Sequence, residues 1–401
     1  MKIIYCIPSC HNSGGMERVL SVKANYLADV VGWDISVITT EPVSQNNHYQ
    51  FSSKIHFYNL DIHYKEIENI SLWKKTIMVL KKKLQHKKKL QELLFHLKPD
   101  IVVSMFTHDV SFLYKIKDGS KKVCELHFSK KFRKLHNESN HAGIAKRMIS
   151  YYLDHRDFKA ASHYDRFVVL TEEDQKTWYP LKNIKVIYNP LPFIAEQTAN
   201  IHTKKVLAIG RLCPQKGFDM LVDIWNVVCK NIEGWELNIY GDGPDYAALD
   251  SKIKQYSLHK TIHMYPATTN IQSVYLNSSI FCFPSRYEGF SMALMEAMSY
   301  GLPAIAFKCP CGPSEIIENG INGILVENKN IKISIDESLV KFIAKTGFDT
   351  VYGARPLRRA IQSNVEDKFA EKMLDGEINA KDNVIVKYSD GEVKIEKVAN
   401  K

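Results

Sequence analysis

The chain has 401 residues, 45% of them hydrophobic and 24% charged, with a formal net charge of +10 at pH 7. This composition is typical of a folded globular protein, and the length suits two or three domains. No apolar run reaches the roughly 18 residues of a membrane-spanning helix, so we expect no segment to cross a membrane. The positive charge favours an anionic partner, without deciding between nucleic acid, lipid headgroups and phosphorylated substrates.

The amino-terminal stretch "MKIIYCIPSC" has only a short apolar run before the turn-like "NSGG", so it predicts a first strand and not a signal peptide. We therefore expect a cytoplasmic protein. Its cysteines are too sparse for a disulfide scaffold and should be reduced thiols. The pair in "CPC" has no second cluster of ligand spacing in reach, which favours a loop over a metal site. The eight are Cys6, Cys10, Cys124, Cys213, Cys229, Cys282, Cys309 and Cys311.

Two series of strand-like apolar runs alternate with helix-like segments, which predicts α/β domains with parallel sheets. The first series runs from residue 2 to about 190, and an aperiodic linker at 189–205 with two prolines follows it. The second series runs from 205 to 327. We predict two doubly wound, Rossmann-like domains, residues 1–192 and 193–328, that face a cleft, because ligands bind at the carboxyl ends of such strands.

A lysine-rich segment, residues 73–98, carries Ile77, Leu80, Leu84 and Leu90 between its charges at roughly helical spacing. This pattern predicts a basic amphipathic helix. One interpretation is a solvated helix face; the other is docking on an anionic membrane surface at the inner face of the cell membrane.

After about residue 329 the alternation stops. The segment reads as a strand, a helix, a loop, a long helix and a hairpin with Asp-Gly at its turn, which predicts a small α+β domain over 329–401.

Two loops carry residues suited to phosphate. In "SCHNSGGMERVL", Gly14 and Gly15 separate the first strand from a helix whose amino terminus offers free N–H groups to an anion, although such a turn is more often only a turn. In "IGRLCPQKGFDML", Arg211 follows a strand and Lys216 precedes a helix. Together these cations could neutralise a diphosphate leaving group; the alternative is two solvated charges on a loop.

The stretch "RYEGFSMALMEAMSYGLPAI" places Glu288 after a buried strand and Glu296 inside the next helix. Carboxylates accept hydrogen bonds from polyol hydroxyls, and the helix amino terminus between them, at Phe290 and Ser291, faces phosphate. One glutamate could hold a sugar and the other a ribose. A metal held by the pair is the competing interpretation, but no third acidic ligand lies nearby.

With "GGMER", "YGDGP", "CGPSEII" and "NGINGILVE" in the same order and spacing, these motifs make residues 1–328 resemble the retaining nucleotide-sugar glycosyltransferases of family 4, which have the GT-B fold. The resemblance implies that Glu288 contacts the donor sugar and Glu296 the ribose. It implies that Arg211 and Lys216 bind the diphosphate and that the Gly14–Gly15 turn faces phosphate. His127, in "CELHFS", matches a histidine beside the donor sugar.

The resemblance also implies a mechanism. The anomeric bond breaks towards an oxocarbenium-like state, the acceptor attacks from the departing face, and neither a metal nor an enzymic nucleophile is required. The partners it implies are a UDP- or GDP-sugar and a glycan or lipid-linked acceptor in bacterial surface polysaccharide synthesis, with no nucleic acid and no cofactor. Alternatives are a GT-B phosphorylase or epimerase, or a non-catalytic interaction protein.

Residues 331–398 are similar to the carboxyl-terminal small domain of Clp-family AAA+ unfoldases, in which the arginine of "GAR", here Arg355, senses ATP. The chain has no G-x4-G-K-[ST] phosphate loop, so we expect no ATPase activity. Family 4 enzymes continue the second domain at this point, so the transferase half looks truncated near Glu327. The resemblance therefore implies a chimera whose transferase activity is uncertain.

Overall fold

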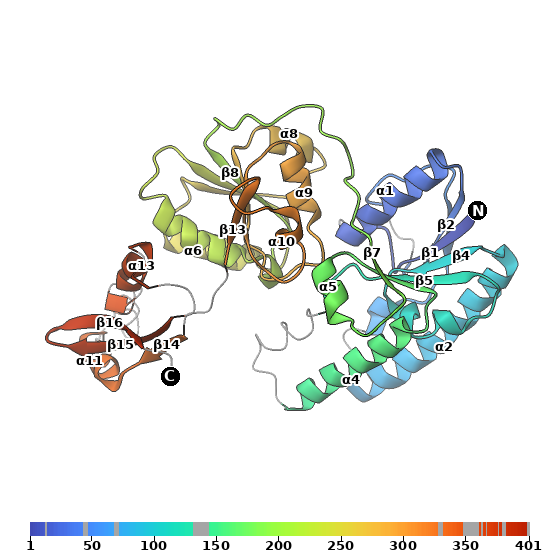
Figure 1. Ribbon diagram of the computed structural model, residues 1–401, viewed down its shortest axis with the longest axis horizontal. Coiled ribbons are helices and arrows are strands. Elements are labelled where there is room, and N and C mark those ends of the chain that lie inside the picture. The colour runs from blue at the N-terminus through green and yellow to red at the C-terminus, as the bar shows by residue number, and fades with distance from the viewer. Residues whose placement is uncertain are drawn as a thin grey trace. The chain divides into compact units, whose positions relative to one another are not determined.

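The computed structural model describes residues 1–12, 14–42, 47–67, 72–130, 144–327, 332–347, 361, 364–365, 367–375, 377–378 and 382–398. The chain divides into two compact units, Met1–Leu325 and Val326–Lys401 (Figure 1).

The first unit begins with a seven-stranded sheet in the order β3-β2-β1-β4-β5-β6-β7, in which every neighbouring pair is parallel. Its strands are short and apolar, as expected where both faces of a sheet are covered. They are β1 (Lys2–Cys6), β2 (Asp34–Thr39), β3 (His56–Asn59), β4 (Ile101–Ser104), β5 (Lys121–Glu125), β6 (Arg166–Val169) and β7 (Ile184–Val186).

Helices cover both faces of this sheet. Because successive side chains of a strand alternate, Ile3 of β1 packs with Leu20 of α1, whereas Ile4 packs with Leu90 of α2. Figure 1 shows α1 on one side of the sheet and α2 with α4 on the other. The helices are α1 (Gly15–Asp29), α2 (Leu72–Leu97), α4 (Ile144–Ala161) and α5 (Glu172–Thr177), with short 3-10 turns η1 (Tyr64–Ile67), η2 (His108–Ser111) and η3 (Leu113–Lys115).

A second sheet follows in the order β10-β9-β8-β11-β12-β13, with parallel pairing from β10 through β12. Helices α6 and α7 bury their apolar sides on one face, and α8 and α9 on the other. The strands are β8 (Lys205–Ile209), β9 (Glu236–Tyr240), β10 (Ile262–Tyr265), β11 (Ile280–Phe283), β12 (Ala304–Phe307) and β13 (Gly323–Val326). The helical elements are η4 (Pro214–Lys216), α6 (Phe218–Val228), α7 (Tyr246–Gln255), α8 (Ile271–Leu276), α9 (Met292–Ser299) and α10 (Pro313–Ile316).

Each parallel sheet has one point where the strand order reverses. In the first sheet it lies between β1 and β4, and in the second between β8 and β11. Loops that leave the carboxyl ends of strands at such a point diverge and leave room for a ligand. This confirms the predicted α/β class with two doubly wound, Rossmann-like domains; the predicted boundaries at residues 192 and 328 stay predictions.

The second unit has a small mixed sheet, in which β15 pairs parallel with β14 and antiparallel with β16. Asp390 and Gly391, both with positive φ, form the hairpin turn that the Asp-Gly pair predicted. Val384, Val386, Val393 and Ile395 are buried against α11 residues Leu339 and Ile343. The elements are β14 (Lys332–Ile335), α11 (Glu337–Gly347), α13 (Asp367–Leu374), β15 (Asn383–Ser389) and β16 (Glu392–Val398).

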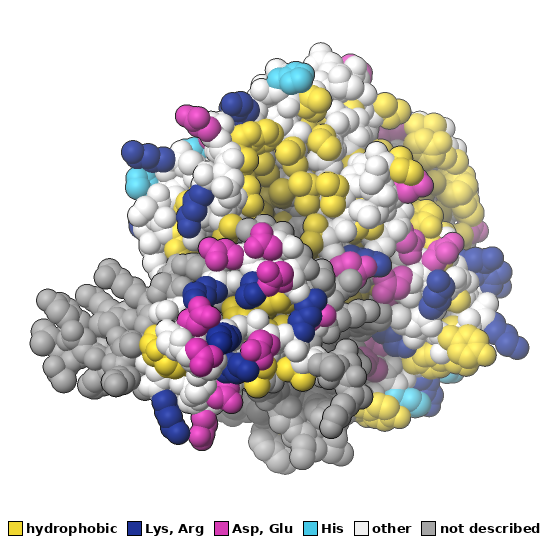
Figure 2. Space-filling model, turned by 60° about the vertical axis from the view of Figure 1, so that its left-hand side comes forward, with side chains coloured by type: hydrophobic (Ala, Val, Ile, Leu, Met, Phe, Trp, Pro, Cys, Tyr) yellow, Lys and Arg dark blue, Asp and Glu magenta, His cyan; other side chains and the backbone are white. Residues whose placement is uncertain are grey.

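The surface of the second unit carries both signs of charge. Lys387 pairs with Glu396 at 2.8 Å, and Lys397 with Asp382 at 2.9 Å. On the forward face in Figure 2, basic and acidic side chains are interspersed and form no patch of one sign.

The lysine-rich segment forms α2, but its apolar residues are divided between core and solvent. Leu90 is buried, whereas Ile77, Leu80 and Leu84 are 55%, 58% and 70% exposed. In the amino-terminal half of α2 these apolar side chains therefore face solvent, and the choice between a solvated helix face and membrane docking stays a prediction. Across the described ranges, no helix is both long enough and apolar enough to span a membrane. All eight cysteines are free thiols.

Candidate functional site

Two of the predicted site residues meet where the strand order of the second sheet reverses. Lys216 in η4, which follows β8, donates from Nζ to Glu288 Oε1 at 2.7 Å, and Glu288 follows β11. Their side chains are 20% and 8% exposed. The ion pair brings together two of the predicted site residues from separate loops.

Two glycines make this pair possible. The stem of Lys216 lies on Gly210, where a Cβ would be 3.2 Å from Lys216 Cδ. Gly217 has φ of +69° and sits so close to Pro284 that a Cβ would be 2.1 Å from its carbonyl oxygen. Both the left-handed backbone and the close approach require glycine here.

Further hydrogen bonds tie the Lys216 loop to the Glu288 loop. Gln215 donates to the Tyr287 carbonyl at 3.0 Å, and the Arg286 backbone N–H donates to the Gln215 carbonyl at 2.8 Å. The Arg286 guanidinium forks onto both oxygens of Asp219, at 2.8 and 2.7 Å. These charged and backbone hydrogen bonds hold the two loops to each other.

Arg211 is exposed and, within the described ranges, makes no hydrogen bond or ion pair. An exposed guanidinium beside the reversal point is able to bind an anion. Its assignment to a diphosphate stays a prediction.

Glu296 lies in α9, which begins after Phe290 and Ser291. The Ser291 hydroxyl caps the helix by accepting from the Leu294 N–H at 3.3 Å. Glu296 is only 2% exposed. Tyr275 donates to its Oε2 at 3.0 Å, and an Arg18 guanidinium nitrogen lies 3.2 Å from its Oε1. Burial raises the pKa of Glu296, and Arg18 and the Tyr275 hydrogen bond oppose that rise.

The Gly14–Gly15 turn begins α1, as predicted, but a carboxylate of the chain already faces it. Glu17 Oε2 lies 2.2 Å from where a Gly14 Cβ would stand, and Asn12 donates to Glu17 Oε1 at 3.2 Å. A carboxylate is favourable at a helix amino terminus. Glu17 therefore lies beside the turn, and the assignment of a phosphate to this turn stays a prediction.

His127 belongs to a buried charged group after β5. Its Nε2 lies 3.3 Å from Glu125 Oε2, and Lys23 of α1 donates to both Glu125 oxygens at 2.6 Å. Burial raises the pKa of Glu125, but Lys23 and His127 outweigh this and lower it to about 2. His127 Nδ1 is buried and has no hydrogen-bond partner in the part of the chain that the structure describes.

The loops of the two sheets contact each other. A Cβ on Gly289 would lie 2.5 Å from the His127 carbonyl oxygen. The Cys311 N–H donates to Glu173 Oε2 at 3.0 Å, and the Glu173 N–H donates to Glu315 Oε1 at 2.9 Å. The contact brings His127, from the first sheet, to the residue next to Glu288.

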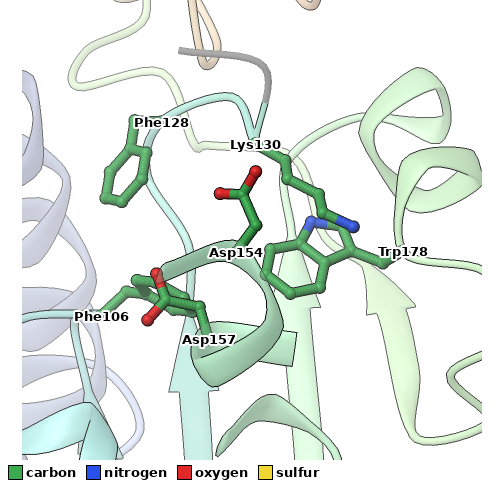
Figure 3. A pocket seen from close by; sticks show the side chains of 6 residues that line it. All are labelled: Phe106, Phe128, Lys130, Asp154, Asp157 and Trp178. Atoms are coloured by element: carbon green, nitrogen blue, oxygen red, sulfur yellow. The ribbon is translucent and has the colours of Figure 1, made fainter. Parts of the chain in front are cut away.

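A small pocket, with room for little more than a water molecule, opens beside the His127 loop (Figure 3). Phe106, Phe128 and Trp178 form apolar walls, and Figure 3 shows the Asp154 carboxylate between Phe128 and Trp178. The Lys130 amine lies 4.5 Å from the centroid of the Trp178 ring. Asp157 also lines the pocket.

Sequence reasoning missed several of these residues. Arg18 belongs to the quoted motif "GGMER", yet nothing local indicates that it reaches Glu296. The glycine of "RYEG" signals close backbone approach, a signal that could have identified Gly289. No three His, Cys, Asp or Glu side chains cluster as a metal site among the residues described. Arg355 lies outside the described residues.

Comparisons with known proteins agree with this architecture. Residues 193–346 match the family model "Glycosyl transferases group 1", and residues 317–386 match that of the C-terminal, D2-small domain of ClpB protein. An uncharacterized glycosyltransferase of Haemophilus influenzae is 30% identical over 337 residues, 82% of this chain and 87% of that protein. AmsD, the amylovoran biosynthesis glycosyltransferase of Erwinia amylovora, is 42% identical over 165 residues, 39% of this chain and 46% of AmsD.

Among solved structures, Staphylococcus aureus TarM in a complex with fondaparinux, α-GlcNAc-glycerol and UDP has a TM-score of 0.64 at 16% identity. The match covers 93% of this chain and 99% of that one, and it supports the predicted GT-B fold. With a relative of this identity matched over most of both lengths, the chain belongs to the group 1 glycosyltransferases.

Proposed function

We propose that this chain transfers a sugar from a UDP- or GDP-sugar to a glycan or lipid-linked acceptor in bacterial surface polysaccharide synthesis. The observation that carries the proposal is the Lys216–Glu288 ion pair at the reversal point of the second sheet. It is a cation and a carboxylate placed where α/β sheets bind ligands. The names of AmsD, from amylovoran biosynthesis, and of the TarM complex with UDP support the substrate class.

On binding, the donor would replace the contact between Lys216 and Glu288 with contacts to the donor itself. Its diphosphate would take Lys216 and the exposed Arg211 as counter-charges. Glu288, released from Lys216, would then accept hydrogen bonds from sugar hydroxyls. The buried Glu296 would accept from the ribose.

The transfer is proposed to follow the retaining, family 4 pattern. The bond between the anomeric carbon and the diphosphate oxygen breaks, and its electron pair leaves with the diphosphate. The acceptor oxygen then bonds to the same face of that carbon and gives its proton to the departing diphosphate. Lys216 and Arg211 stabilise the growing negative charge, so the proposal includes no metal and no cofactor.

The acceptor would approach from the first sheet. His127 adjoins the Gly289 contact, and the pocket of Phe106, Phe128 and Trp178 lies beside the same loop. We assign acceptor binding to this side, with His127 beside the donor sugar.

A binding screen tests the proposal. Wild-type protein, Lys216→Met and a distant control, Arg166→Met, would be titrated calorimetrically with UDP, GDP and their sugars. At least one nucleotide should bind wild type and the control, and Lys216→Met should bind it about 10-fold more weakly, as expected when a charged hydrogen bond is lost. Folded protein that binds none of them would contradict the proposal. Orthophosphate-dependent cleavage of an oligosaccharide would favour a phosphorylase.

We also propose that α2 contacts anionic membranes, where a lipid-linked acceptor would lie. Ile77, Leu80 and Leu84 are exposed on it, and so are Lys81 and Lys88. Exposed apolar and basic side chains on one helix favour the headgroup region of an anionic bilayer. Lys82 does not contribute, because it is held by Glu66 at 2.8 Å and the Ile62 carbonyl at 2.7 Å.

For the carboxyl-terminal unit we propose a Clp-type module without ATPase activity, joined to the transferase as a chimera. Its own core and the match of residues 317–386 support this. Deleting residues 330–401 tests whether it is an appendage: the melting temperature and nucleotide binding of the remaining chain should then change little. A marked loss of nucleotide binding on deletion would contradict the interpretation of this unit as an appendage and would show that it supports the transferase.

A further inference from the structure

We propose that Arg18, in α1 of the first sheet, is a positioning residue that holds the Glu296 carboxylate of the second sheet ready for the ribose of the donor. The inference rests on the proposed function and adds to it a residue from the opposite domain. It follows from the arrangement of Arg18, Glu296 and Tyr275.

The Arg18 guanidinium is held at Glu296 by contacts on several sides. One nitrogen lies 3.2 Å from Glu296 Oε1, and its central carbon lies 5.7 Å from the Tyr49 ring and 5.9 Å from the Phe193 ring. Contacts with two aromatic faces fix the planar group and restrict its rotamers. Arg18 therefore meets a loop of the first sheet, the interdomain linker and α9 at one point.

Within the described residues, one carboxylate oxygen of Glu296 accepts a hydrogen bond and the other accepts none. Oε2 accepts from the Tyr275 hydroxyl at 3.0 Å. Oε1 is buried and, although it is paired in charge with Arg18, it receives no hydrogen bond from any described residue. Because buried polar atoms are normally hydrogen-bonded, an unused carboxylate oxygen in a 2% exposed residue indicates a ligand hydroxyl. A ribose hydroxyl is the donor of that kind in a nucleotide-sugar.

The arrangement also explains why a buried carboxylate can be ionised here. An isolated buried charge is unfavourable unless a counter-charge accompanies it. The groups that face Glu296 are Arg18 from α1, Tyr275 from α8, Tyr49 from the loop before β3 and Tyr300 at the end of α9. Arg18 supplies the counter-charge from the other domain, so the ribose acceptor is complete only when α1 is in place.

The acid dependence of nucleotide binding separates positioning from general support of the fold. Burial raises the pKa of Glu296, Arg18 is the largest opposing influence, and the Tyr275 hydrogen bond is the next. Removing Arg18 therefore lets Glu296 hold its proton to higher pH. A protonated carboxyl group accepts hydroxyl hydrogen bonds less well, so nucleotide binding should fail at a higher pH than in wild type.

The experiment compares wild type, Arg18→Met, Arg18→Lys, Tyr275→Phe and the control Arg166→Met. Among the described residues, the Arg166 guanidinium donates to the Asp165 carbonyl alone. UDP and GDP binding would be measured by calorimetry between pH 5 and 8, after thermal unfolding confirms that each variant is folded.

Arg18→Met should weaken binding of the nucleotide that wild type binds by about 10-fold at pH 6, the effect of losing one charged partner. Its loss of affinity should shrink towards pH 8. Arg18→Lys should recover most of the affinity. Tyr275→Phe should raise the pH at which nucleotide binding fails by less than Arg18→Met does.

Binding by Arg18→Met equal to wild type at every pH overturns the inference. So does a loss of equal size at all pH values that lysine fails to rescue, because that result describes a packing role. Failure of wild type to bind either nucleotide would refute the proposed function itself, which the wild-type titration alone reveals.

Discussion

Replacing Gly289 with alanine should separate the two domains at the site without unfolding either. The added Cβ would stand 2.5 Å from the His127 carbonyl oxygen and 2.8 Å from Phe128 Cα, whereas ordinary contacts begin near 3.4 Å. One backbone segment must therefore retreat by about 0.9 Å, the difference between 3.4 and 2.5 Å. A misplacement of about 1 Å near a reacting centre can reduce turnover by roughly 100-fold.

The control for this substitution is Gly119→Ala. Gly119 has φ of +91° and open space around its Cβ position, so alanine there strains the backbone by about 1–2 kcal/mol without touching the site. Initial rates of sugar transfer and thermal unfolding would be measured for both variants. Gly289→Ala should lose turnover with little change in melting temperature, and Gly119→Ala the reverse. Full turnover in Gly289→Ala would refute the contact as part of the working site.

Three further outcomes follow from the charges and exposures. Arg211→Ala should reduce turnover by about 100-fold with no change in melting temperature, because the side chain is exposed; normal turnover would remove it from the diphosphate site. The double change Leu80→Ser and Leu84→Ser should weaken co-sedimentation with anionic vesicles but not neutral ones, and unchanged sedimentation would leave α2 a solvated helix. Glu125 has a pKa of about 2 against an ordinary 4.5, so its stabilisation is present above pH 4.5 and is lost as the pH falls towards 2. Glu125→Gln should therefore be less stable at neutral pH and lose less stability on acidification; an unchanged acid unfolding curve would argue against the Lys23 pairing.

The fold could be predicted from sequence because parallel strands covered on both faces are continuous apolar runs. The placement of Lys216 and Glu288 at one site could be predicted for a related reason. Both residues lie in loops that follow such strands, and strands at a reversal point bring their loops together. Local sequence and one topological rule were enough for these residues.

The contact between Arg18 and Glu296 could not be predicted in that way, because it depends on how the two sheets pack and no local pattern reports it. The exposure of Ile77, Leu80 and Leu84 is a second case. Helical periodicity gives the relative direction of side chains but not which half of a long helix the sheet covers. Glu17 is a third, since a glycine turn at a helix amino terminus suits either a phosphate or a neighbouring carboxylate.

The central claim is transfer of a sugar from a nucleotide diphosphate through the Lys216–Glu288 pair. The direct measurement is release of UDP or GDP from a panel of UDP- and GDP-sugars, with and without glycan acceptors, by wild type and Lys216→Met. At least one donor should release its nucleotide, faster with an acceptor present, and Lys216→Met should reduce that rate by roughly 100-fold. Release from no donor by folded wild-type protein, or equal release by Lys216→Met, would contradict it.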